Sequence, residues 1–126
     1  MMNPKASLYL RSYLLLSSCL PVLGLLLLGC HSTPPPTPLD QLTAQQTHGH
    51  AVFQQRCAQC HNDRNADPLH GPSVMGLYKK PYMPSGAPAN DDRVSATILH
   101  GRNLMPPRPD VDAQDLTDVL SYLHTL

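Results

Sequence analysis

The sequence contains no tryptophan and a single phenylalanine, and only 14% of its 126 residues are charged. With so few aromatic side chains, a domain of this length has little material for a large apolar core and usually needs a staple of some kind. Runs of valine, isoleucine and aromatic residues are also absent, which argues against a buried parallel sheet. From Cys30 onward seven lysines and arginines accompany nine aspartates, and no basic patch predicts binding to nucleic acid.

The one long apolar run lies near the N-terminus and predicts a signal peptide over residues 1–29. Lys5 and Arg11 precede this run, an order that is typical of an export signal. The run ends in the letters LLGC, which resemble the lipobox of bacterial lipoproteins and make Cys30 the predicted lipidated residue. Cys19 is the poorer candidate because leucine-rich sequence continues behind it. An uncleaved signal anchor is the alternative, since the run is near the lower limit for spanning a bilayer.

Both alternatives place the protein outside the cytoplasm, anchored on the periplasmic side of a bacterial inner or outer membrane. Residues 30–47 then form the lipidated cysteine and a proline-rich tether, with four prolines between positions 34 and 38. Such a segment buries little and prefers extended polyproline conformations. A tether of this length reaches roughly 20 Å when coiled and about 50 Å when extended. The folded domain is expected over residues 48–126.

The string CAQCH, residues 57–61, is the most informative motif in the chain. Two cysteines separated by two residues and followed by histidine form the pattern of covalent haem attachment. The thiols of Cys57 and Cys60 can add to the two vinyl groups on one haem edge, while the imidazole of His61 ligates the iron. A thioredoxin-like redox pair would need a βαβ surround. A zinc site would need further ligands, and His61 and His70 miss the usual finger spacing.

Helical signals occupy three segments of the expected domain. Asp112 is a good N-cap, and leucine and valine recur behind it at helical spacing. A second helix is predicted from near Asp91 to Gly101, where the glycine can end it in a left-handed conformation. A third, shorter helix should lead from Gly49 into Cys57. Five prolines between residues 61 and 90 predict loops there, with one turn of helix near residues 73–78.

A histidine-ligated haem needs a second axial ligand, and Met105 is the predicted one. It follows a predicted helix end, stands in a proline-stiffened loop and lies far from His61 in sequence. A thioether ligand raises the reduction potential of the iron. Met83 and Met75 are the competing thioethers, and a bis-histidine haem would use His70 or His100 instead.

Residues 48–126 resemble the class I monohaem cytochromes c. The resemblance implies a small all-α cytochrome c fold, with three to four helices packed around one covalently attached haem c. It implies that Pro72 packs on the proximal imidazole and that its carbonyl accepts the ring hydrogen bond, which tunes the iron. It also places Phe53 and Tyr122 where the first and last helices cross. The residues that carry it are Gly49 and Phe53, the CAQCH motif, Leu69 to Pro72, Ile98 to Gly101, Met105-Pro106 and Tyr122-Leu123.

The predicted function is electron transfer by a single haem with His61 and Met105 as axial ligands. With both axial positions filled, we expect no enzyme activity and no small-molecule substrate. The expected partners are redox proteins of a respiratory chain or a periplasmic dehydrogenase. The alternatives are a haem subunit fixed in a dehydrogenase or oxidase complex, and a haem enzyme or gas sensor in which Met105 is displaced.

Overall fold

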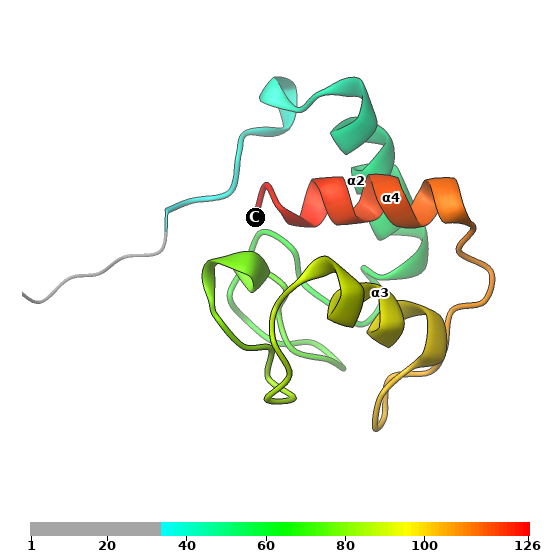
Figure 1. Ribbon diagram of the computed structural model, residues 1–126. Helices are drawn as coiled ribbons and strands as arrows, with labels where there is room; N and C mark the ends of the chain where they lie inside the picture. The colour runs from blue at the N-terminus through cyan, green and yellow to red at the C-terminus, as the bar shows by residue number, and fades with distance from the viewer. Residues whose placement is uncertain (1–33) are drawn as a thin grey trace, which may run out of the picture. The chain divides into compact units, whose positions relative to one another are not determined.

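The computed structural model describes residues 34–126, so the predicted signal peptide and Cys30 lie outside the described residues. The predicted all-α class is confirmed, because the described chain contains helices and no strand. None of its helices has the length and hydropathy of a membrane span. The helices shown in Figure 1 are α2 (Ala44–Arg56), α3 (Asp91–His100) and α4 (Ala113–Leu123), with short 3-10 helices η1 (Leu39–Gln41) and η2 (Leu77–Lys79).

Helix α2 begins earlier than the sequence predicted. Thr43 and Gln46 form a reciprocal capping box, in which the Gln46 N–H donates to Thr43 Oγ1 over 3.2 Å and the Thr43 N–H donates to Gln46 Oε1 over 3.0 Å. These bonds satisfy two of the N–H groups that a helix start leaves without partners. The helix therefore starts five residues ahead of Gly49, within the segment predicted to be tether.

Helices α3 and α4 begin and end where their sequence signals predict. Asn90 caps α3 by accepting the Arg93 N–H at 3.0 Å, and Asp112 caps α4 by accepting the Asp115 N–H at 2.8 Å. Gly101 ends α3 with a φ of +73°, a region that other residues rarely adopt. The proline-rich stretch between α2 and α3 is loop apart from η2, as its composition predicted.

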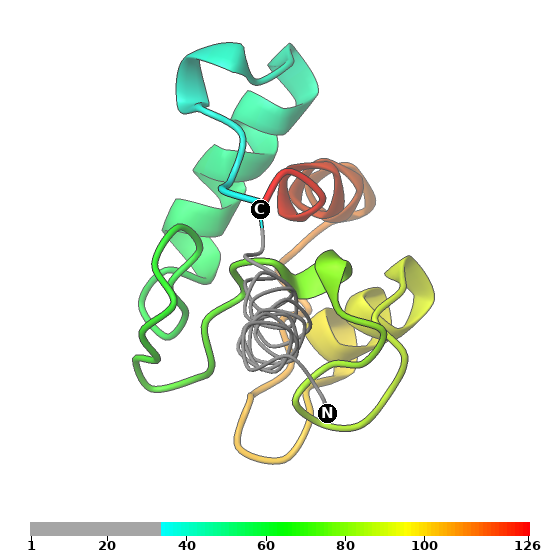
Figure 2. The same ribbon diagram turned by 90° about the vertical axis from the view of Figure 1, so that its left-hand side faces the viewer.

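The core forms where α2 crosses α4 (Figures 1 and 2). Gly49 permits the crossing, because a Cβ there would collide with the backbone carbonyl of Asp118. The rings of Phe53 and Tyr122 meet at the crossing with centroids 6.0 Å apart, and both side chains are fully buried. The pair that the resemblance placed at the helix crossing is therefore in contact.

The first described residues are bonded to the domain rather than free of it. The Thr37 N–H donates to the Thr125 carbonyl at 2.8 Å, and Arg64 Nη2 donates to the Thr37 carbonyl at 2.8 Å. Lys79 Nζ reaches the Pro34 carbonyl at 2.9 Å. We call residues 34–38 the strap. An extended proline-rich chain leaves its carbonyls free to accept such bonds, so the folded unit starts well before the predicted boundary at His48.

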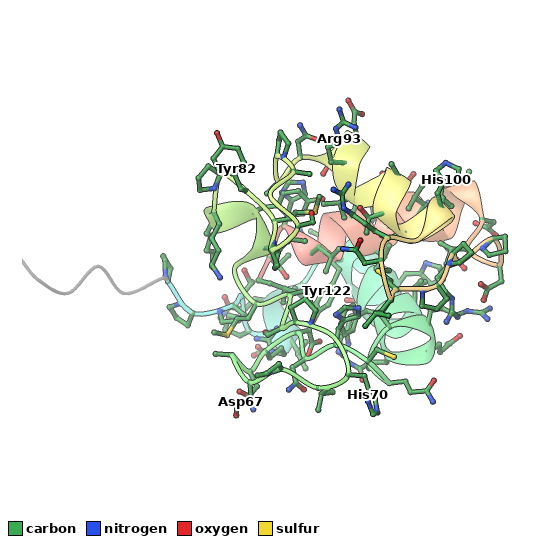
Figure 3. The ribbon with its side chains drawn as sticks, turned by 90° about the horizontal axis from the view of Figure 1, so that it is seen from below. Asp67, His70, Tyr82, Arg93, His100 and Tyr122 are labelled. Atoms are coloured by element: carbon green, nitrogen blue, oxygen red, sulfur yellow. The ribbon has the colours of Figure 1, made fainter. Side chains whose placement is uncertain are left out.

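The loop segment after α2 and helix α3 lie on opposite sides of α4, the last helix of the chain. In Figure 3, Asp67 and His70 lie on one side, Arg93 and His100 of α3 lie on the other, and Tyr122 of α4 lies between them. Figure 2 shows the same arrangement from another direction, with the segment after α2 and helix α3 on either side beneath α4. The segment of Asp67 and His70, which follows the CAQCH motif in the sequence, and helix α3 therefore lie on opposite sides of Tyr122.

Candidate functional site

The CAQCH segment is a tight turn at the C-terminal end of α2. The Cys57 N–H closes the helix on the Phe53 carbonyl at 2.8 Å. The Cys57 carbonyl then accepts the N–H groups of Cys60, at 2.9 Å, and His61, at 3.0 Å. Both cysteines are free thiols and partly exposed. The turn therefore presents two thiols and an imidazole within five residues, on a base fixed by the buried end of a helix.

The imidazole of His61 is oriented by the loop that follows. Its Nδ1 donates to the Pro72 carbonyl at 2.8 Å, since a carbonyl can only accept. The proton on Nδ1 leaves the lone pair of Nε2 free to bind a metal ion. This is the contact that the resemblance assigned to Pro72.

Gly71 also belongs to this site, although the sequence predicted no role for it. An added Cβ at this position would lie 2.5 Å from His61 Cε1 and 2.8 Å from His61 Nδ1. The Gly71 N–H also donates to the Cys60 carbonyl at 2.8 Å. Gly71 therefore lets the backbone lie directly against the imidazole. From the local sequence alone, a glycine that makes such a close contact looks the same as a glycine in a turn.

Asp63 connects the turn to the crossing of α2 and α4. Tyr122 Oη donates to Asp63 Oδ2 at 2.6 Å, and Gln54 Nε2 donates to the same oxygen at 3.3 Å. Burial raises the pKa of Tyr122, and the neighbouring carboxylate raises it further, so the phenol keeps its proton. The ring of His50 packs on Tyr122 with centroids 5.0 Å apart. These contacts hold the segment after His61 against both helices.

The thiol environment disfavours the redox and zinc alternatives. Burial raises the pKa of Cys57 to about 11, with a smaller opposing effect from the Arg108 guanidinium. A thioredoxin-like pair needs the opposite, a thiol whose pKa is lowered so that the thiolate can attack. Within residues 34–126, no group of three or more His, Cys, Asp or Glu side chains is placed to hold a metal ion. A dithiol redox pair and a zinc site are therefore both disfavoured at these two cysteines.

Met105 stands on a separate loop, between α3 and α4. Met105 and Arg102 exchange two backbone hydrogen bonds, of 2.9 and 3.0 Å, and the loop folds back over Gly101. A Cβ on Gly101 would lie 2.5 Å from the Met105 carbonyl oxygen, so the glycine is needed for this fold. The Met105 side chain is half-buried against the core, and its neighbour Leu104 is fully exposed.

The competing thioethers differ in burial. Met83 is buried in the core with 9% of its surface exposed, which commits its side chain to packing. Met75 is half-buried, and its backbone N–H is held by the Ser73 hydroxyl at 3.1 Å. His70 and His100 are exposed, and no side-chain hydrogen bond within the described residues orients either ring. Of the three thioethers, Met83 is the one whose side chain is buried in the core, whereas Met75 and Met105 are both half-buried.

Two further histidines, His48 and His124, pair with aspartates. His48 Nδ1 donates to Asp118 at 2.8 Å, and His124 Nε2 donates to Asp91 at 2.9 Å. These pairs join α2 to α4 and the end of α4 to the start of α3. They serve the packing of helices rather than the site.

The residues present fit a c-type haem. The turn offers two unpaired thiols for thioether bonds and an imidazole whose Nε2 is free, and the Met105 loop offers a thioether. Arg64 Nη1 is buried without a hydrogen-bond partner in the described part of the chain, and the carboxylates of a haem would satisfy such a donor. The structure brings Cys57, Cys60, His61 and Pro72 together, whereas Cys30 lies outside the described residues.

Comparison with known proteins finds similarity to c-type cytochrome sequences. The family model described as cytochrome C oxidase, cbb3-type, subunit III matches residues 44–123, which begin at the first residue of α2. A cytochrome c-553-like protein of Synechocystis sp. is 28% identical over 85 residues, which cover 68% of this chain and 72% of that protein. The residues matched by the family model include the turn at residues 57–61, Pro72 and Met105.

Proposed function

This chain belongs to the c-type cytochrome domain family that the subunit III model describes, and on that premise we propose that it carries one haem c, bonded through Cys57 and Cys60 and ligated by His61 and Met105. Members of such a family carry out haem-based electron transfer, and the chain is an electron carrier rather than an enzyme. When bound, the haem supplies an iron that takes up and releases one electron at a time.

The hydrogen bond from His61 to Pro72 is the observation that carries the proposal. It fixes the tautomer that an iron ligand needs, and it increases the basicity of the ring nitrogen that faces the metal. Gly71 lets the loop lie close enough for this bond to form at 2.8 Å. A surface histidine without a function has no need of such an arrangement.

Met105 completes the proposed ligand set from the other loop. Its half-buried position and its backbone bonds to Arg102 keep the thioether in one place. A ligand set that changes little between oxidation states suits an electron carrier, because little reorganisation accompanies each transfer. The fully exposed Leu104 beside it offers an apolar contact for a redox protein that docks transiently.

We further propose that the protein is exported, lipidated at Cys30 and held on the periplasmic side of a membrane. The strap shortens the tether that the sequence predicted, because Thr37 is already bonded to Arg64 and Thr125. The chain between Cys30 and Thr37 spans at most roughly 25 Å when extended. The domain then stays near the membrane, within reach of redox proteins of a respiratory chain that sit in it.

The test is to produce the full chain in cells that attach haem c and to analyse the exported protein. We expect mass spectrometry to find one haem, and alkylation to find neither Cys57 nor Cys60 reactive. The oxidised protein should show the weak near-infrared band of sulfur-to-iron charge transfer, and Met105→Ala should remove it. A mature protein with two free thiols and no added macrocycle would refute the proposal.

A fixed haem subunit of an oxidase or dehydrogenase complex is the second candidate. Two observations favour it: the matching family model is described as an oxidase subunit, and the strap limits how far the domain can move. Solubilisation of membranes in a mild detergent separates the two candidates. A fixed subunit should co-purify with haem-containing partners in a constant ratio, whereas a mobile carrier should elute alone.

A further inference from the structure

Three charged side chains join the two loops of the haem site. Asp110 accepts Arg56 Nη1 on Oδ2 at 2.8 Å. It also accepts Arg108 through two parallel bonds of 3.1 Å, from Nε to Oδ1 and from Nη2 to Oδ2. One carboxylate is thus held by two guanidinium groups, one of which lies 54 residues away in sequence. We call these three residues the Asp110 clamp.

The two arginines lie close in sequence to the two parts of the proposed haem site. Arg56 is the last residue of α2 and immediately precedes Cys57, the first attachment thiol. Arg108 follows Met105 by three residues, and its backbone N–H donates to the Ile98 carbonyl at 2.9 Å. Asp110 therefore connects the element that bears the thiols and His61 to the loop that bears the predicted second ligand.

The segment between Met105 and Arg108 is stiff, so the position of Arg108 affects the position of Met105. Pro106 and Pro107 are the two residues between Met105 and Arg108, and each has a fixed backbone φ. On the other side, the Arg102–Met105 bonds and the close approach to Gly101 hold the loop against the end of α3. Release of the Arg108 side chain would therefore loosen one end of the segment, which would then be held there by the backbone bond from Arg108 to Ile98.

We propose that Asp110 is a positioning residue for the axial ligand: the clamp keeps the Met105 loop closed, so that the thioether stays on the iron and small anions are kept off it. The inference rests on the proposed ligation by His61 and Met105. The side chains of Arg56, Asp110 and Arg108 are 38%, 40% and 30% exposed, so the ion pairs add little to global stability and are weakened by salt. Their effect should appear in local opening of the loop.

The test uses the oxidised, haem-loaded full chain and the exogenous ligand azide, which binds only when Met105 leaves the iron. Asp110→Asn removes the charge and keeps the size of the side chain. We expect the apparent azide affinity to rise roughly threefold to fivefold, the size of effect that exposed ion pairs have on the local opening of a loop. In high salt the wild type should approach the variant. Asp110→Glu, which keeps the charge, should restore most of the wild-type behaviour.

Asp91→Asn is the matched control. It breaks another exposed aspartate pair, that with His124 at 2.9 Å, and this pair has no contact with the Met105 loop. Its azide affinity should equal that of the wild type. Arg56→Gln gives a second variant, because it cuts only the link to α2 and leaves the Asp110–Arg108 pair intact. It should change azide affinity in the same direction as Asp110→Asn.

The outcomes separate the clamp from the ligation on which it rests. A wild type without the near-infrared band, or with a band that survives Met105→Ala, would overturn the ligation and the clamp with it. A Met105-dependent band together with equal azide affinities in Asp110→Asn, Arg56→Gln and Asp91→Asn would overturn the clamp alone.

Discussion

Gly71→Ala is the substitution that most directly tests how His61 is held. The new Cβ would lie 2.5 Å from His61 Cε1 and 2.8 Å from Nδ1, and neither the helix-borne turn nor the loop can move without breaking a bond. The imidazole must therefore tilt or the loop must retreat, and either movement lengthens the 2.8 Å bond to Pro72. Gly71 itself has no positive φ, so the cost of alanine there is steric and not conformational.

The size of the effect follows from two contributions. Overpacking of this kind costs about 1–3 kcal/mol of stability. Weakening of the His61–Pro72 bond lowers the basicity of the ligating nitrogen, which disfavours the oxidised iron and raises the reduction potential. A neutral hydrogen bond contributes about 1 kcal/mol, and only part of it differs between oxidation states. Since a tenfold change in equilibrium corresponds to about 59 mV for one electron, we expect a rise of roughly 20–40 mV.

The assay is a redox titration of the haem-loaded protein, combined with urea unfolding of the same sample. Gly86→Ala is the matched control, because Gly86 has a φ of +79° and no atom within 4 Å of an added Cβ. It should lose stability through backbone strain and keep its potential. An unchanged potential in Gly71→Ala, or equal shifts in both variants, would refute the role given to the loop of Pro72.

Three further substitutions test the contacts around the site. Tyr122→Phe removes the 2.6 Å bond to Asp63 and should cost about 2 kcal/mol in urea unfolding. Thr37→Pro deletes the strap's N–H donor and should cost about 1 kcal/mol and speed proteolysis of the strap, whereas Thr37→Ala should not. Hydrogen bonds, chiefly from Gln114, lower the pKa of Asp118 below its ordinary 3.8. The stabilisation by the ionised Asp118 is therefore present above pH 3.8 and is lost as the pH falls through the folded-state pKa. Asp118→Asn should therefore make the free energy of unfolding fall less steeply as the pH is lowered.

The parts of the fold that sequence reasoning could predict are those with local signals. Asp112 and the leucines behind it define α4, and CAQCH defines the attachment turn, because each pattern lies within a dozen residues. The start of α2 was missed because the Thr43–Gln46 capping box stands in a segment whose composition is that of a linker.

The parts that could not be predicted depend on contacts between distant segments. The strap is held by Arg64, Lys79 and Thr125, none of which is near it in sequence. The Asp110 clamp joins residues 54 apart, and an aspartate between two arginines in a proline-rich loop looks like an ordinary exposed charge until the fold is known. Such contacts have no periodicity or spacing from which to be inferred.

The segment that carries the two attachment cysteines contributes no side chain to the buried hydrophobic core of the described chain. The ten buried hydrophobic side chains of the described chain lie in α2, α3 or α4, or are those of Met83, Val111 and Leu126, and none lies between Gln54 and Tyr82. That segment, which carries both thiols and His61, is ordered by hydrogen bonds and by partial burial. Fixing each residue of such a segment costs about 1–2 kcal/mol of backbone entropy, which these bonds alone offset poorly. A bonded porphyrin would add apolar contact area to this segment. The segment proposed to hold the haem would then also be stabilised by it.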